Sequence, residues 1–251
     1  MEDSKSGRRV LVSEHISRKE LKHDRVRESI EHGAEAVLSH TRIASIVLLA
    51  GIVLLCGYYG YKIYNDRQTA QAQTALDDAM KIFNAQILLP GQSNLPGEVS
   101  YVDPMQRSQD AEVRLSAVAA KFPSTPPGRL ARYYSAICLM DMDKLNQASE
   151  ELKKLQNGSD KELAALANFQ QALIAERSGK NDQAIQILHT LSNSGSILVP
   201  KPLVLLELAG IYRQTDPKKA VTLYEQIKKD YPNTSVADEA DRGLGAIAPQ
   251  S

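Results

Sequence analysis

The sequence lacks the motifs with which most enzymes hold phosphates, metal ions or nucleophiles. No GxGxxG, P-loop, HExxH, CxxC or GxSxG pattern occurs in its 251 residues. Adjacent acids such as Asp77 and Asp78 point to different faces of a helix, so they cannot act together as an acid and a base. His189 is the one histidine beyond residue 40, and it stands among leucines as a surface or core histidine does. We therefore expect no enzyme activity, no cofactor, no metal site and no small-molecule substrate.

Charge surplus and disulfides are also missing. The 30 basic residues match the 30 acidic ones, so no basic excess is available to attract nucleic acid. Of the two cysteines, Cys56 lies in a long apolar run and Cys138 lies far outside it, so the two cannot form a disulfide. The surrounding segment, YYSAICLM, is apolar and helical in pattern, and we expect Cys138 to be a buried structural thiol.

One long apolar run is present, and it can be interpreted in three ways. Ile43 to Tyr61 carries no charge, and as a helix it would span about 28 Å, close to the roughly 30 Å core of a bilayer. A cleaved secretory signal is disfavoured because 42 residues precede the run. A lipoprotein signal is disfavoured because the large Leu55 precedes Cys56. We therefore predict a retained transmembrane helix over residues 43–64, with Tyr58, Tyr59, Tyr61 and Tyr64 at one membrane interface.

The basic residues predict the orientation of this anchor. The 42 residues before the run are richer in Lys and Arg than an equal length after it, where only Lys62, Arg67 and Lys81 occur. Because such residues are retained in the cytoplasm, we expect residues 1–42 to be a cytoplasmic tail. Within it, the capping box that starts at Ser17 predicts an amphipathic helix over residues 17–40. The tail histidines are spaced too far apart for a metal site.

Beyond the run the sequence repeats every 36 residues with helical spacing. The alanines Ala148, Ala184 and Ala220 anchor the register. Four further columns keep the same period: Leu152, Leu188 and Tyr224; Leu155, Leu191 and Ile227; Ala136, Ala172 and Leu208; and Asp143, Gly179 and Thr215. A small residue followed by large ones lets two helices approach closely and fill the space between them. Each period is therefore one helix-turn-helix unit.

These units resemble tetratricopeptide repeats, although the period is two residues longer than usual and tryptophan is absent. The resemblance implies an all-α fold: one transmembrane helix followed by an α-solenoid of three to four repeats. We predict a helix and a Pro/Gly-rich loop over residues 65–104, with the loop at Leu88 to Pro104. The repeat domain then covers residues 105–251 and ends in a capping helix whose N-cap is Thr234 or Ser235.

In repeats of this kind the first helix of each unit lines the concave, partner-binding side. The register places one column at Tyr133, Phe169 and Leu205, and the next columns include Ile137, Leu173, Met140, Tyr212, Arg177 and Arg213. We predict a peptide-binding groove formed by Tyr133, Ile137, Met140, Phe169, Leu173, Arg177, Tyr212 and Arg213. For Tyr133, Phe169 and Leu173 a plain role in the core between helices is an equal alternative. The loop at residues 88–104 is the alternative binding surface.

The complete layout is similar to that of the single-span ancillary subunit of the bacterial Sec translocon, and SRKELKHD is the most family-like segment of the tail. The resemblance implies an inner-membrane protein with a periplasmic repeat domain. Its partners would be the translocon, a periplasmic chaperone or prolyl isomerase, and unfolded clients. The alternatives are a cytoplasm-facing import or adaptor receptor, and a signalling regulator that depends on its tail. Deletion of residues 1–40 would abolish signalling but spare groove binding.

Overall fold

The computed structural model describes residues 41–89 and 97–247, with the backbone alone for Arg42 and Ile43. The predicted tail helix at 17–40 and part of the predicted loop, 90–96, lie outside the described residues. The chain forms two compact units, Met1–Ile63 and Tyr64–Ser251. The predicted domain boundaries, which differ slightly from this division, stay a prediction.

The long helix α2, Thr41–Phe83, carries both the apolar run and the first helix of the repeats. In its first part the large apolar side chains are exposed, as illustrated by Leu54 at 74% and Tyr61 at 70%. By length and composition this part can cross a membrane. In its last part Ala72, Leu76, Ala79 and Ile82 are buried at helical spacing, because they pack against the next helices of the repeat unit. The helix ends at Phe83.

The connection after α2 contains a short β pairing that the sequence did not predict. Strand β1, Gln86–Ile87, pairs in parallel with strand β2, Ser100–Tyr101. The backbone N–H of Leu88 extends the pairing by donating to the carbonyl of Tyr101 at 2.8 Å. The Tyr101 hydroxyl donates to Asp110 at 3.0 Å and so ties the pairing to the following helix.

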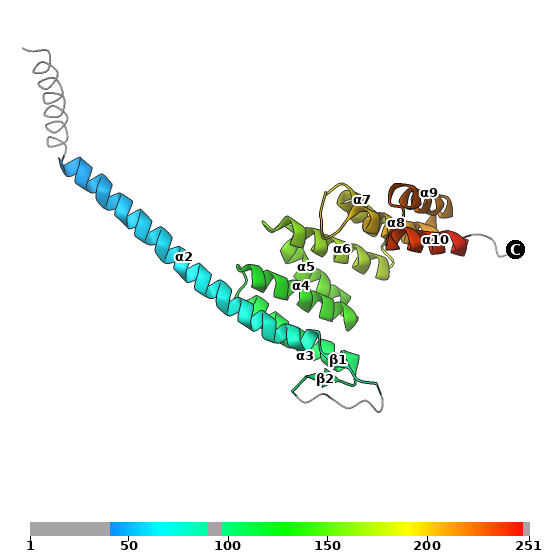
Figure 1. Cartoon of the computed structure of the whole chain (residues 1–251), viewed down its shortest axis with the longest axis horizontal. Coiled ribbons are helices and arrows are strands. Elements are labelled where there is room, and N and C mark those ends of the chain that lie inside the picture. Colours follow the sequence, from blue (N-terminus) through cyan, green and yellow to red (C-terminus); the bar gives the residue numbers. More distant parts are fainter. Residues whose placement is uncertain (1–40, 90–96, 248–251) are drawn as a thin grey trace, which may run out of the picture. The chain divides into compact units, whose positions relative to one another are not determined.

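Eight further helices follow in the described part of the chain (Figure 1). They are α3 (Pro104–Lys121), α4 (Pro126–Asp141), α5 (Leu145–Gln156), α6 (Lys161–Arg177), α7 (Asn181–Ser192), α8 (Lys201–Thr215), α9 (Pro217–Asp230) and α10 (Ser235–Ile247). Each packs against its neighbour in sequence, and α10 packs against both α8 and α9. The pairs α2–α3, α4–α5, α6–α7 and α8–α9 are four repeat units, and α10 is the cap. The predicted all-α repeat solenoid is confirmed.

The core has the period that the sequence predicts. The anchor alanines Ala148, Ala184 and Ala220 are fully buried, and every residue of the two large-residue columns is at most 5% exposed. The earlier unit repeats the pattern with Ala111, Leu115 and Val118. Burial of these columns between consecutive helices removes apolar surface from water and so stabilises the folded repeat domain. No disulfide contributes, because Cys138 is free.

Turns within two units are built alike. Asp143 and Gly179 both have positive φ, 57° and 72°, in the residue that closes the first helix. In both turns the following N–H bonds back to the last helical turn, Lys144 to Leu139 and Lys180 to Ala175, each at 2.8 Å. This Schellman arrangement satisfies the carbonyls at a helix end. The third residue of this column, Thr215, does not form such a turn. It is still helical as the last residue of α8, and α9 begins at Pro217. At the cap, the N-cap is Thr234, whose hydroxyl accepts from Ala237 N at 3.2 Å.

Candidate functional site

Three of the residues predicted to line the groove belong to the core. Tyr133, Met140 and Phe169 are only 8%, 6% and 8% exposed. For Tyr133 and Phe169 this is the alternative that the sequence left open. Met140 of α4 is buried in the same apolar cluster as Tyr133. These three side chains stabilise the scaffold and offer little surface to a partner.

A neighbouring column provides the accessible surface. One residue further along each first helix stand Tyr134, Gln170 and Leu206, all partly exposed, beside the predicted Ile137 and Leu173. The shift of one residue turns a helical position by about 100°, which is enough to move it from the interior to the surface. We call Tyr134, Ile137, Gln170, Leu173 and Leu206 the first-helix face. Three members of this face, Tyr134, Gln170 and Leu206, lie one residue after the predicted column of Tyr133, Phe169 and Leu205, and the groove itself stays a prediction.

Neighbouring contacts support this face. The ring of Tyr134 lies 5.0 Å from that of Phe83 of α2, centroid to centroid. The Gln170 side chain donates to the Tyr133 hydroxyl at 3.2 Å, which joins α6 to α4. The face therefore combines apolar side chains with one polar group on a rigid support, an arrangement suited to an extended or helical peptide.

Two of the three predicted charged and aromatic anchors have partners within the domain. Arg177 donates to the Met140 carbonyl at 3.4 Å and pairs with Asp143 at 3.2 Å, so it links α6 to the turn of the preceding unit. The Lys219 ammonium lies 5.1 Å from the centre of the Tyr212 ring. Arg213 is exposed and has no ion pair among the described residues. Of the predicted anchors, Arg213 is therefore the one with a free charge.

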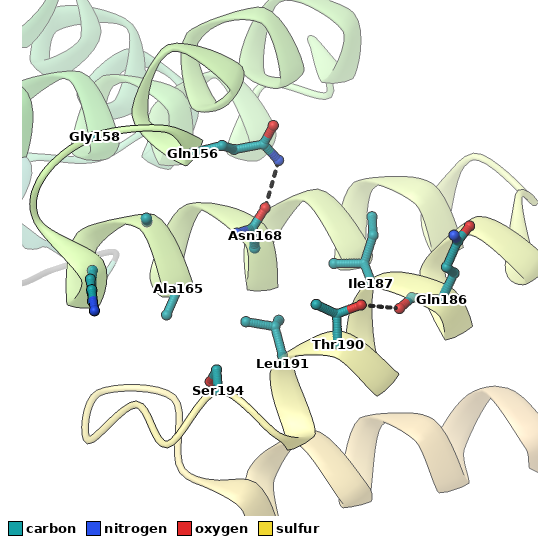
Figure 2. A pocket seen from close by; sticks show the side chains of 11 residues that line it. Gln156, Gly158, Ala165, Asn168, Gln186, Ile187, Thr190, Leu191 and Ser194 are labelled. Atoms are coloured by element: carbon teal, nitrogen blue, oxygen red, sulfur yellow. Dashed lines mark hydrogen bonds between the residues drawn. The ribbon is translucent and has the colours of Figure 1, made fainter.

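Three cavities of about 390, 760 and 530 Å³ lie away from the predicted groove residues. The first is formed by α6, α7 and the end of α5, over a floor that includes Ala165 and Leu191 (Figure 2). At its rim Gln156 donates to Asn168 at 2.7 Å. Among the described residues, no unpaired charge other than that of Lys161 points to a ligand for this cavity.

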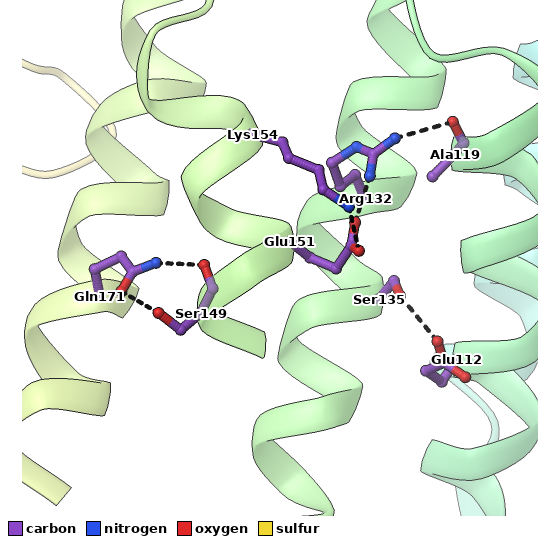
Figure 3. Close-up of polar contacts among 8 residues, drawn as sticks. All are labelled: Glu112, Ala119, Arg132, Ser135, Ser149, Glu151, Lys154 and Gln171. Atoms are coloured by element: carbon purple, nitrogen blue, oxygen red, sulfur yellow. Dashed lines mark hydrogen bonds and ion pairs between the residues drawn. The ribbon is translucent and has the colours of Figure 1, made fainter. Parts of the chain in front are cut away.

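The cavity of about 760 Å³ between α3, α4 and α5 is lined by charged groups, and three of them, Arg132, Glu151 and Lys154, pair with one another (Figure 3). Arg132 pairs with Glu151 and also donates to the Ala119 carbonyl. Burial raises the pKa of Glu151, but the hydrogen bonds and charges of Lys154 and Arg132 outweigh it and leave that pKa below its ordinary value. The charges of this network are therefore used within the domain, where Arg132 links neighbouring units.

A second kind of link recurs in register. Ser135 of α4 donates to Glu112 of α3 at 3.3 Å (Figure 3). One period on, Ser149 donates to Gln171 at 3.0 Å and Gln171 donates back to the Ser149 carbonyl at 2.7 Å. In these two units, the position of the first helix that faces the preceding second helix is therefore polar, and its polar group is hydrogen-bonded.

The third member of this column is Glu207 of α8, and it stands at the register of Ser135 and Gln171. Its counterpart on α7 is Ile185, which cannot hydrogen-bond. Glu207 has no hydrogen bond or ion pair among the described residues, and burial together with the charge of Glu176 raises its pKa. Sequence reasoning missed Glu207, although one charge inside the apolar run LLELAG was a usable signal.

The remaining titratable groups do not indicate catalysis. Cys138 is fully buried, and its burial raises the pKa of the thiol to about 12, so no reactive thiolate forms near neutral pH. His189 is exposed on α7. Within residues 41–89 and 97–247, no cluster of His, Cys, Asp and Glu could hold a metal ion.

Family models and a solved structure are similar to parts of this chain. No curated protein matches the sequence closely enough to count as a relative. The crystal structure of nearly identical TPR-like repeats from a Podosopora anserina protein, described as a kinesin light chain, is similar at 16% identity and a TM-score of 0.49. That match covers 57% of this chain and 77% of the other. The family model for the tetratricopeptide repeat-like domain matches residues 41–195, and that for the tetratricopeptide repeat matches residues 203–234. The chain therefore belongs to the tetratricopeptide repeat-like domain family.

Proposed function

We propose that the protein is a membrane-anchored scaffold for protein–protein interaction that serves as an ancillary subunit of the bacterial Sec translocon. The family itself supports the general part of this proposal, because tetratricopeptide repeats mediate binding of protein partners. The anchor, the translocon and the periplasmic location are the specific parts of the proposal.

The observation that carries the anchor is the exposed apolar first part of α2. From Ile46 to Tyr64 the large apolar side chains of this helix are 49–74% exposed. Soluble proteins rarely expose so large a contiguous apolar surface to water. A bilayer would cover it, and the run is long enough to span the hydrocarbon core. The basic excess of the tail favours a cytoplasmic N-terminus and a periplasmic repeat domain.

The translocon is proposed from the layout of tail, span and repeats that the sequence shares with the ancillary subunit. In this proposal the first-helix face binds partly unfolded clients or a chaperone or prolyl isomerase. Its mixture of Tyr134, Leu173 and Leu206 with the polar Gln170 suits segments that expose apolar side chains.

Two experiments test the proposal with the full-length chain. Protease added to bacterial spheroplasts should digest the repeat domain while a cytoplasmic marker stays intact. A domain that survives until the inner membrane is lysed would contradict the periplasmic location and favour the cytoplasm-facing adaptor. Affinity purification from mild detergent should recover translocon subunits, and their absence would contradict the proposed partner.

A further inference from the structure

A pocket of about 320 Å³ lies where α8, the first helix of the fourth repeat unit, meets the capping helix α10. It adjoins the first-helix face, because Leu206 belongs to both. The residues lining it are Leu206, Glu207, Gly210, Arg213, Tyr224, Glu239, Arg242 and Gly243. Two of them, Glu207 and Tyr224, have side-chain oxygens with no hydrogen-bond partner among the described residues.

Glu207 is unsatisfied because of the repeat register. Ser135 and Gln171 occupy its position in the two preceding units, and both bond to a polar group on the preceding second helix. The corresponding residue before Glu207 is Ile185, so this carboxylate is partly buried without a partner among the described residues. Partial burial of an unpaired carboxylate is costly, and natural proteins keep such a cost mainly where a ligand uses the group.

Tyr224 gives an independent indication of a ligand. Tyr224 as a whole is only 3% exposed, but its hydroxyl reaches the pocket and has no hydrogen-bond partner among the described residues. Leu152 and Leu188 occupy its column in the other units, so the core does not need a hydroxyl here. A Cβ at Gly243 would lie 2.4 Å from the ring carbon that bears this hydroxyl. Glycine at that position of α10 thus allows the tyrosine to reach the pocket.

We propose that this pocket binds a basic side chain, lysine or arginine, of a polypeptide lying on the first-helix face. The inference rests on the proposed function, because it names the chemistry of the partner at that same surface. The ammonium or guanidinium group of such a side chain donates several hydrogen bonds. It would donate to the Glu207 carboxylate and the Tyr224 hydroxyl and would neutralise the buried charge.

The other charges of the pocket refine the partner. Arg242 pairs with Glu239 at 2.7 Å, so these two charges are already compensated. Arg213 is exposed, and its charge is free. It would repel a second basic residue and attract an acidic one. The fitting segment is therefore one basic residue with an acidic neighbour rather than a run of basic residues.

Binding of two probes to the full-length chain in detergent micelles tests the inference. The first is n-butylammonium, the head of a lysine side chain, with n-butanol as the uncharged control. The second is a short fluorescein-labelled peptide of leucine, serine and alanine with a central Lys-Asp, with the same peptide acetylated on lysine as its control. Fluorine NMR of 3-fluorotyrosine-labelled protein, assigned through Tyr224→Phe, reports the pocket, and fluorescence anisotropy reports the peptide.

We expect n-butylammonium, but not n-butanol, to shift the Tyr224 signal saturably. The lysine peptide should bind about tenfold more tightly than its acetylated form, since hydrogen bonds to charged groups are strong. Glu207→Gln should abolish both effects, whereas Glu225→Gln, on the exposed surface of α9, should leave them unchanged.

An unmoved Tyr224 signal with n-butylammonium would overturn the inference. Equal affinity for the two peptides in the unaltered protein would also overturn it, while leaving the first-helix face intact as a binding surface. A Tyr224 signal that responds to n-butylammonium while neither peptide binds would uphold the cation site and count against the proposed function of the face.

Discussion

At the scale of single residues, Tyr224 and Gly243 depend on each other. Replacing Gly243 by alanine places a Cβ 2.4 Å from the Tyr224 ring, and the core must shift to accommodate it. We expect Gly243→Ala to lower the free energy of unfolding by about 1–3 kcal/mol. A lower thermal midpoint, followed by circular dichroism of the full-length chain, would show it.

Two further variants serve as controls for this prediction. Tyr224→Leu in the Gly243→Ala background should recover most of the loss, because leucine fills this column in two other units. Gly245→Ala should be neutral or stabilising, since a Cβ there meets nothing within 4 Å and alanine favours a helix. If Gly243→Ala and Gly245→Ala behave alike, the contact between α9 and α10 is wrongly described.

Glu207 should make stability depend on pH. Its pKa is raised from an ordinary value of 4.5 by burial and then by Glu176 of α6, while Arg213, Glu239 and Tyr224 line the same pocket. The native state therefore holds a proton that the unfolded state releases, and stability decreases as pH rises above about 4.5 through the raised pKa.

Glu207→Gln removes this penalty. We expect it to raise the thermal midpoint at neutral pH, with a gain that shrinks as the pH falls toward and below 4.5, where the glutamate becomes protonated in both states. The exposed Glu225→Gln variant is the matched control. A gain that is constant from pH 4 to 7 would contradict the account of Glu207.

At the scale of helices, the buried alanine column keeps paired helices close. Ala184 is fully buried within the cluster formed by α6 to α9. We expect Ala184→Leu to overpack the site and cost about 1–3 kcal/mol in unfolding free energy. Gln183→Leu adds the same side chain at the neighbouring exposed position of α7 and should cost far less. Equal thermal midpoints for the two variants would refute the register.

The same column explains how far the sequence could predict the fold. A period seen in five columns identifies the paired helices, and their caps and turns follow from residues such as Gly179 and Thr234. The pairing of β1 with β2 could not be predicted, because two-residue strands are too short to show a periodicity.

The site was predicted less well than the fold for a geometric reason. A repeat period shows which residues occupy equivalent positions, but it does not show which of two adjacent columns faces outward. Tyr133 and Tyr134 are both plausible from sequence, and only the packing of α4 against its neighbours places Tyr133 in the core. Glu207 was missed because it lacks a hydrogen-bond partner only if the apolar Ile185 stands opposite it. That placement is known only from the fold.

At the scale of the whole molecule, an apolar helix leads into a repeat domain, and we propose its first-helix face as the surface that binds protein partners. In such arrays each unit contacts mainly its neighbours, so equivalent surface positions form a continuous track. The first helices offer such a track from Tyr134 to Leu206 and the adjoining pocket. The second helices present cavities whose charges, among the described residues, are largely paired.

Photo-crosslinking in living cells tests this central claim most directly. Benzoylphenylalanine replaces either Gln170, on the first-helix face, or Gln186, an exposed glutamine of α7 beside the cavity of about 390 Å³. The account predicts discrete adducts with envelope or secreted proteins from position 170 and few from position 186. Adducts from position 186 with none from position 170 would show that the first-helix face is not where partners bind.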